Sequence, residues 1–280
     1  MKALFARPGN VVLFFVLWLM VFLSLAPFVF MVLGSFKTNH ELISLTPSLL
    51  PQNGFNLDKY AALFAYWPFL RNLFNSVVVS SIVTLSVTVT SLLVGYSLAK
   101  FEFPGRGILT VIIIATLMVP FETRLVPTYV LFRSLGLINT YAGLVIPGMV
   151  TAFGIFMVRQ FALDSVPDEL LEAARLDGAS EFRILRSIVA PILAPALVSL
   201  ALLTFINSWN DFLWPLVAVV NSDMFTVSVA LRSLADPSNI TDYGMVLAAA
   251  VISVIPVLAV FALFSRQITT AVMQGSGRES

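Results

Sequence analysis

The stretch DSVPDELLEAARLDGASEFRILRSIVAP, residues 164–191, is a polar interruption between long apolar runs and holds six of the fifteen acidic residues of the chain. Asp164 or Ser165 is suited to cap a helix, and Pro167 suits its first position, where a missing backbone N–H does no harm. Acidic residues follow directly, where the helix dipole favours anions. The stretch therefore predicts a helix that begins at Pro167.

Two small residues divide this stretch. Gly178 suits the left-handed backbone conformation that ends a helix, and Ser180 is suited to cap the next one. The second helix is expected to run through Phe182, Leu185 and Ile188 toward Pro191. The prediction is a compact helical hairpin over residues 164–188.

One face of the first hairpin helix is small and apolar. Leu170, Ala173, Ala174 and Asp177 recur at helical spacing, with Leu171 beside them. Small side chains allow a second surface to approach closely. Two interpretations remain open at this point: a knob that docks into another protein, or an ordinary helix packed on its own bundle.

The composition around the hairpin indicates a membrane protein. Hydrophobic residues make up 59% of the chain and charged residues 11%, whereas soluble domains carry about 25% charged residues. So few charges are not enough to cover a water-facing surface, so lipid is expected over most of it.

Six segments are long and apolar enough, or nearly so, to cross a bilayer, which takes about 20 residues. Such continuous apolar runs satisfy their backbone only as helices, and the alternation of barrel strands is absent. We therefore predict an all-α polytopic membrane protein with six transmembrane helices. The expected segments are Val11–Phe36, Leu73–Ala99, Gly107–Pro127, Tyr141–Met157, Ile188–Val220 and Met245–Phe264. The fifth is too long for one span, so part of it is expected to run along an interface.

Basic residues in the connections favour one orientation. With the N-terminus in the cytoplasm, ten of the sixteen Lys and Arg residues fall on that side. Both termini and the 164–188 hairpin are then cytoplasmic. The connection over residues 37–72 lies outside; it carries turn signals at Pro47, Pro51 and Asn53-Gly54 and predicts a short amphipathic helix over residues 57–64.

Several chemistries are disfavoured by what the sequence lacks. There is no cysteine and only one histidine, so no metal site is expected. Basic residues do not cluster as nucleic-acid contacts would require. No phosphate-binding glycine loop and no catalytic constellation is found, so the chain is expected not to be an enzyme.

The hairpin sequence resembles a known signature. Glu172-Ala173-Ala174, three residues, Gly178, nine residues, Ile188 and then Pro191 are similar to the EAA motif of permease subunits of ABC importers. The likeness covers nearly the whole chain and points to the maltose-type, carbohydrate class. Segments similar to that class are Gly34-Ser35-Phe36-Lys37, Asn75-Ser76, Phe103-Pro104-Gly105-Arg106, Leu135-Gly136-Leu137 and Trp209–Pro215. The tail after Thr270 departs from the usual pattern, which leaves any contact of the tail with the ATPase open.

The resemblance implies a type I ABC importer permease fold in the bacterial inner membrane. The whole chain, 1–280, is expected to be one permease domain, with the family core over about 70–266. It further implies a second homologous permease, an ATPase dimer that binds ATP and Mg, and an extracytoplasmic solute-binding protein; this chain itself holds no cofactor. The residues expected to couple to the ATPase are Glu172, Ala173, Ala174, Asp177 and Gly178.

Candidate solute-path residues come from polar side chains inside the apolar segments, which are expensive in lipid. They are Glu122, Arg124, Asn207, Trp209, Asn210 and Asp211. Trp209 and Trp214 either stack on a sugar or anchor at the interface, and Glu122 with Arg124 either forms a local ion pair or lines the path. Pro120 to Pro127 is where the third helix is expected to break. By resemblance, the turn expected to contact the binding protein is Asp236, Pro237, Ser238 and Asn239.

The solute stays open between classes. Few charges with aromatic and amide groups suit a sugar, oligosaccharide or polyol, while Arg124 would suit glycerol 3-phosphate or a glycerophosphodiester. A rival of another class is an ion-coupled secondary carrier, which predicts inverted repeats and intramembrane acids. No clear repeat is found, and Asp211 is the only acid well inside a segment.

Overall fold

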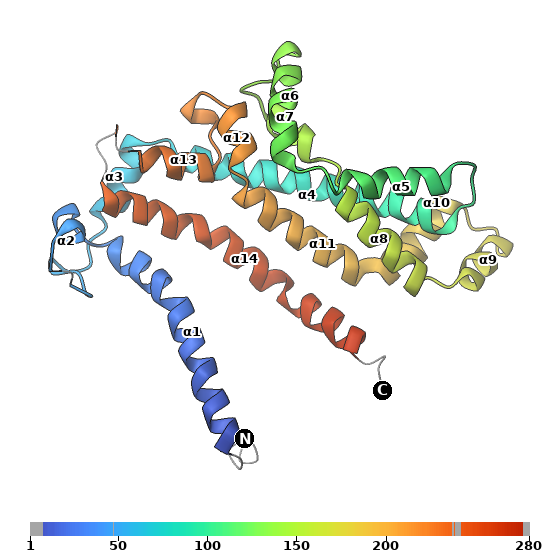
Figure 1. Cartoon of the computed structure of the whole chain (residues 1–280), viewed down its shortest axis with the longest axis horizontal. Coiled ribbons are helices and arrows are strands. Elements are labelled where there is room, and N and C mark those ends of the chain that lie inside the picture. Colours follow the sequence, from blue (N-terminus) through green and yellow to red (C-terminus); the bar gives the residue numbers. More distant parts are fainter. Residues whose placement is uncertain (1–7, 47, 237, 239–241, 277–280) are drawn as a thin grey trace. The chain divides into compact units, whose positions relative to one another are not determined.

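The computed structural model describes residues 8–46, 48–236, 238 and 242–276. In that part of the chain every regular element is a helix, which confirms the all-α prediction (Figure 1). The α-helices are α1 (Pro8–Gly34), α2 (Asn39–Ile43), α3 (Asp58–Tyr66), α4 (Phe69–Lys100), α5 (Arg106–Thr116), α6 (Phe121–Ser134), α7 (Tyr141–Val145), α8 (Ala152–Ser165), α9 (Asp168–Leu176), α10 (Glu181–Ile184), α11 (Ala190–Asn210), α12 (Leu213–Ala218), α13 (Val227–Leu234) and α14 (Tyr243–Ser276).

The helices provide up to six membrane spans. Four are long and apolar enough by themselves: Val12–Gly34, Phe69–Lys100, Glu181–Asn210 and Tyr243–Phe264. Two more arise if each bent pair counts as one span, namely α5 with α6 and the residues 141–148 with α8. The predicted number of six is reached on that count.

The chain divides into two compact units. One contains the residues up to Phe69 together with Leu231–Ile255; the other contains Leu70–Ala230 and the residues from Pro256 onward. The second unit holds a continuous apolar core drawn from α4, α6, α8, α9, α11 and α12. Within it, α8 packs against both α11 and α5 (Figure 1).

Glycines let α4 and α8 approach closely. A Cβ added at Gly95 would lie 2.9 Å from the backbone nitrogen of Arg159, and one at Gly154 would lie 2.3 Å from Ser91 Oγ. Small residues at such contacts are the usual means by which membrane helices pack, because lipid offers no hydrophobic drive for association. The hydroxyls of Thr88 and Thr90 on α4 donate to the carbonyls of Thr84 and Ser86 in the preceding turn.

The third predicted segment breaks earlier than expected. The helix ends at Thr116, and α6 starts directly after Pro120 at an angle of 98° to α5. Pro120 has no N–H to continue the ladder and restricts the residue before it, so the break precedes Pro120. Pro127, which was expected to share in the break, lies inside α6.

The fifth predicted segment has other bounds than Ile188–Val220. Its helix begins at Glu181, passes through a π-helical turn over Leu185–Val189 and ends at Asn210. The π turn comes just before Pro191, which cannot donate a backbone hydrogen bond. A break at Asp211 and Phe212 separates α11 from the short helix α12, so the segment is not one continuous helix.

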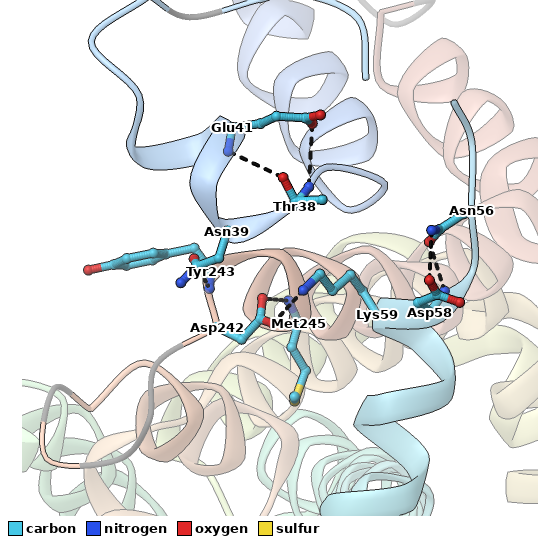
Figure 2. A network of polar contacts seen from close by, with 9 residues as sticks. All are labelled: Thr38, Asn39, Glu41, Asn56, Asp58, Lys59, Asp242, Tyr243 and Met245. Atoms are coloured by element: carbon cyan, nitrogen blue, oxygen red, sulfur yellow. Dashed lines mark hydrogen bonds and ion pairs between the residues drawn. The ribbon is translucent and has the colours of Figure 1, made fainter. Parts of the chain in front are cut away.

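In the first unit, polar contacts tie the 37–59 region to the start of α14 (Figure 2). The Lys59 ammonium pairs with Asp242, and the backbone N–H of Tyr243 donates to Asn39 Oδ1 at 3.1 Å. Thr38 and Glu41 form a capping box that starts α2, a helix the sequence analysis did not predict. The short helix expected over 57–64 is confirmed as α3.

Candidate functional site

The hairpin predicted over 164–188 is present, and α9 and α10 form its two arms. Gly178 adopts the left-handed conformation, with φ of +76°. Ala179 N–H donates to the Ala174 carbonyl and Gly178 N–H to the Arg175 carbonyl, both at 3.0 Å, which is the hydrogen-bond pattern of a Schellman cap. Ser180 caps α10 by accepting from the Arg183 N–H, as predicted.

The start of the hairpin differs from the prediction. Asp164 and Ser165 do not cap α9, because α8 runs through Ser165. Pro167 occupies the N-cap position of α9 with extended backbone and no side-chain cap, so it precedes the helix instead of opening it. Val166 is held extended before the proline, as the proline ring requires.

Two ion pairs hold the hairpin. The Lys100 ammonium at the end of α4 lies 2.8 Å from the carboxylate of Asp168, the first residue of α9. Arg175 Nε donates to Glu181 Oε1 at 2.7 Å, joining α9 to α10 across the glycine turn. This hydrogen bond raises the pKa of the Arg175 guanidinium above its usual value.

The apolar face of α9 is divided between the two sides of the helix. Leu171 is buried and Ala174 half-buried, and both pack on the core of their own unit. Leu171 and Ala174 therefore lie on the side of α9 that packs on its own bundle, whereas Leu170, Ala173 and Asp177 are exposed. Among the exposed positions of the hairpin are Leu170, Glu172, Ala173, Leu176, Asp177, Gly178 and Phe182.

A groove of about 360 Å³ lies between α9 and the end of α4. It is rich in charge, and Lys100 and Arg175 on its wall are already paired with Asp168 and Glu181. Its lining residues are Ala99, Lys100, Glu102, Arg106, Asp168, Leu171, Glu172 and Arg175. Glu172 is thus both exposed on the hairpin and part of the groove wall.

Glu122 and Arg124 occupy the first turn and a half of α6, and both side chains are exposed. Among the described residues no ion pair joins them; the Arg124 guanidinium instead lies over the Phe121 ring, 5.9 Å from its centroid. The local ion pair considered from sequence is not formed. A second groove, of about 310 Å³, opens nearby between Leu125, Val126, Tyr129 and Val217, and none of the six predicted path residues lines it.

The candidates at the end of α11 fall into two groups. Asn207 and Asn210 are exposed, and the Asn210 amide donates to the Ile206 carbonyl. Trp209 is only 3% exposed and stacks on Phe205 with ring centroids 5.8 Å apart. In this conformation its ring is open neither to a solute nor to the membrane interface.

Asp211 and Trp214 also serve the fold. Asp211 is half-buried at the break between α11 and α12, and its carboxylate lies near the backbone N–H groups of Trp214, Phe212 and Leu213. Trp214 is buried, and its indole N–H donates to the Gly143 carbonyl at 2.9 Å. Neither alternative considered for Trp214, sugar stacking or interfacial anchoring, matches this burial.

Three asparagines hold the connection after α12, a role that was not predicted from the sequence. Asn72 and Asn75 on α4 donate to the carbonyls of Ser222 and Asp223 respectively, and both donate to the Phe225 carbonyl. Asn139 accepts from two backbone N–H groups, those of Val220 and Asn221, each at 3.1 Å. Asn75 lies in the Asn75-Ser76 pair already noted by resemblance, which was the available signal.

The turn expected at 236–239 is described only in part, since Pro237 and Asn239 lie outside the described residues. Asp236 accepts from both the backbone N–H and the hydroxyl of Ser238. These bonds hold the pKa of the Asp236 carboxyl below its usual value. Among the described residues no group of three or more His, Cys, Asp or Glu side chains is placed to hold a metal.

Comparison with known proteins gives the family. Residues 91–270 match the model of the binding-protein-dependent transport system inner membrane component. The arabinooligosaccharides transport system permease protein of Halalkalibacterium halodurans is 34% identical over 250 residues, 88% of each chain. The sn-glycerol-3-phosphate transport system permease protein of Rhizobium meliloti is 39% identical over 197 residues, 70% of each chain.

The fold is also shared with a solved structure. A chain of a bacterial ABC transporter involved in the import of the acidic polysaccharide alginate superposes with a TM-score of 0.83. The match covers 94% of this chain and 98% of the other at 22% identity, which speaks to fold alone. Together with the family match, this shows that the chain belongs to the binding-protein-dependent transport system inner membrane components, the permease subunits of ABC importers.

Proposed function

We propose that this permease lies in the bacterial cytoplasmic membrane with both termini and the 164–188 hairpin in the cytoplasm, and that the hairpin couples it to an ATPase. The hairpin carries this proposal: an exposed helix is rigidly held at both ends and turns on a left-handed glycine. ATP and Mg then bind to separate ATPase subunits, and this chain contributes no catalytic group.

Within the hairpin, each residue has a role that fits its exposure. Glu172 pairs with a basic group of the ATPase, Ala173 allows close approach, and Asp177 with Gly178 forms the exposed turn. Leu176 is 89% exposed and supplies apolar contact area. Ala174, half-buried, serves instead to seat α9 on its own bundle.

The remaining partners are a second homologous permease and an extracytoplasmic solute-binding protein, which meets the turn at Asp236 and Ser238 together with Pro237 and Asn239. The exposed polar residues Glu122, Arg124, Asn207 and Asn210 line the solute path, while Trp209 and Asp211 shape it from within the fold. The whole chain acts as one permease domain in this assembly.

For the solute, we favour a neutral oligosaccharide. The relative named for arabinooligosaccharides matches 88% of the chain. Glycerol 3-phosphate is the second candidate, since a relative named for it is 39% identical and Arg124 is exposed for an anion. Uptake of labelled arabino-oligosaccharide and of labelled glycerol 3-phosphate is measured for the wild type and for Arg124→Gln. Only transport of the phosphate should depend on the positive charge of Arg124.

The coupling role is tested by Gly178→Asp, with Gly136→Asp as the matched control. Both glycines have positive φ, and a Cβ at either one meets nothing within 4 Å, so the two changes impose a similar backbone strain. In the purified complex we expect only the Gly178 variant to lose uptake while ATP hydrolysis continues. Normal uptake by that variant, or purification of the wild-type chain as a complete homo-oligomer without an ATPase, would contradict the proposal.

A further inference from the structure

The loop between α2 and α3 presents its apolar side chains outward. Together with Ile43, the last residue of α2, it holds six exposed large apolar residues, from 62% for Ile43 to 101% for Leu45. Residues 43–57 contain no charged side chain. The six exposed residues are Ile43, Leu45, Leu49, Leu50, Phe55 and Leu57. Six exposed large apolar side chains within fifteen residues, unlike a single exposed leucine, indicate an apolar partner.

Two charged side chains that precede this loop, Lys37 and Glu41, are turned inward. The Lys37 side chain is buried, and its ammonium donates to the Ser48 carbonyl. Glu41 is buried too, and its carboxylate accepts from the Asn53 amide at 3.1 Å and from the Thr38 N–H. A loop in water shows the opposite arrangement. Polar groups satisfied within the protein, with apolar side chains outside, are what a lipid environment demands.

The loop begins where a lipid-facing helix ends. The side chains of α1 are exposed throughout its span, Val12–Gly34, except near its last turns. The span ends at Gly34, and eight residues, half of them in α2, separate it from Ile43. At the far end of α3 stand Tyr66, which is exposed, and Trp67, residue types that concentrate at the membrane–water boundary.

We propose that the 43–57 loop is a membrane-interface anchor, whose six exposed apolar side chains insert at the boundary between lipid headgroups and acyl chains. The charged residues that commonly surround a docking surface for a soluble partner are lacking over residues 43–57. The anchor is connected to α14. The contacts Lys59–Asp242 and Asn39–Tyr243 join the residues on either side of the loop to the first turn of α14 (Figure 2). The inference depends on the membrane-spanning fold and not on the solute.

The absence of cysteine from the sequence makes the test direct. The full-length chain is reconstituted in bilayers with one cysteine, Leu49→Cys or Phe55→Cys, labelled with an environment-sensitive fluorophore. These positions lie on either side of the Asn53-Gly54 turn, so a local defect in one variant does not affect the other. Quenching is compared between lipids with a nitroxide at the headgroup, lipids with a nitroxide deep in the acyl chain, and iodide in water.

Two control positions calibrate the measurement. Phe22→Cys on α1 should be quenched by the deep lipid nitroxide, and Leu176→Cys on the hairpin by iodide. For the loop positions we expect quenching by the shallow nitroxide to exceed quenching by iodide several-fold. Iodide quenching at the level of the Leu176→Cys control would overturn the proposal. So would lipid quenching that disappears when the solute-binding protein or the second permease is added, because the loop would then be a protein-docking surface.

Discussion

The Lys100 ammonium lies 2.8 Å from the Asp168 carboxylate and so joins the last residue of α4 to the first residue of α9. The lysine side chain is 5% exposed and the aspartate 72%. Each charge also stands at the helix end whose dipole favours it, the cation at a C-terminus and the anion at an N-terminus. The pair therefore links a membrane helix to the hairpin with a fixed polarity.

Removing the two partners should have unequal effects. Asp168→Asn leaves a buried ammonium without its counter-charge and should lower the free energy of unfolding by about 1–3 kcal/mol. Lys100→Met leaves only an exposed carboxylate and should destabilise less. Thermal unfolding in detergent, followed by tryptophan fluorescence, measures both, with Glu169→Gln in the same helical turn as the control. The double reversal Lys100→Asp with Asp168→Lys should restore little, because both charges then oppose the helix dipoles.

Glycine at position 95 should be required by its neighbours and not by its backbone. A Cβ there would lie 2.9 Å from Arg159 N and 3.0 Å from the Ile155 carbonyl oxygen, and backbone atoms cannot move aside cheaply. Gly95→Ala should destabilise the protein by about 1–3 kcal/mol through overpacking. Gly107→Ala is the control, since nothing lies within 4 Å of its Cβ and its φ is ordinary. Equal stability of the two variants would show that α4 and α8 are not held at this distance.

Asn139 should tolerate only a narrow set of replacements. It is the one described non-glycine residue with positive φ, +62°, and its side chain accepts from two backbone N–H groups. Asn139→Asp keeps the acceptor and should remain near the wild type. Asn139→Gly keeps the backbone freedom but loses both bonds, at about 1–2 kcal/mol, and Asn139→Ala adds the strain of a left-handed Cβ residue. Unfolding measurements should find Asn139→Asp the most stable, Asn139→Gly next and Asn139→Ala the least stable. An Asn139→Gly variant less stable than Asn139→Ala would contradict the prediction.

The sequence predicted the hairpin because its signals are local. Gly178 ends one helix and Ser180 caps the next, and both effects depend only on neighbouring residues and not on the rest of the fold. The cap at Asp164 or Ser165 was wrong because α8 extends through both residues, and the length of α8 depends on packing against α11 and α5. Local propensity does not reveal where a packed helix stops.

The site residues that were missed depend on partners far along the chain. Asn72 and Asn75 bond carbonyls about 150 positions away, and apart from the resemblance at Asn75-Ser76 no local pattern indicates these partners. Trp209 was considered for a solute or an interface because an aromatic residue near a span end usually sits there. Its stacking on Phe205 in the interior becomes visible only when the end of α11 is placed.

The pair Lys59–Asp242 has two separable roles. Asp242 Oδ2 lies 2.5 Å from the ammonium, while Oδ1 accepts from the Met245 N–H and caps the start of α14 (Figure 2). Both side chains are partly buried, so the ion pair alone is worth about 0.5–1.5 kcal/mol, and the cap adds about 1 kcal/mol.

Three variants separate these roles. Lys59→Met removes the charge but keeps a stem to pack over Gly244, and Asp242→Asn keeps an oxygen for the cap; both should show only the smaller loss. Asp242→Ala loses ion pair and cap together and should be the least stable in thermal unfolding. High salt should lower the thermal stability of the wild type to about that of Lys59→Met, because salt screens the ion pair and leaves the helix cap intact. Arg232→Ala, which breaks an exposed pair with Asp236, is the control and should leave stability unchanged. If Lys59→Met proved as damaging as Asp242→Ala, the ion pair and not the helix cap would hold the start of α14.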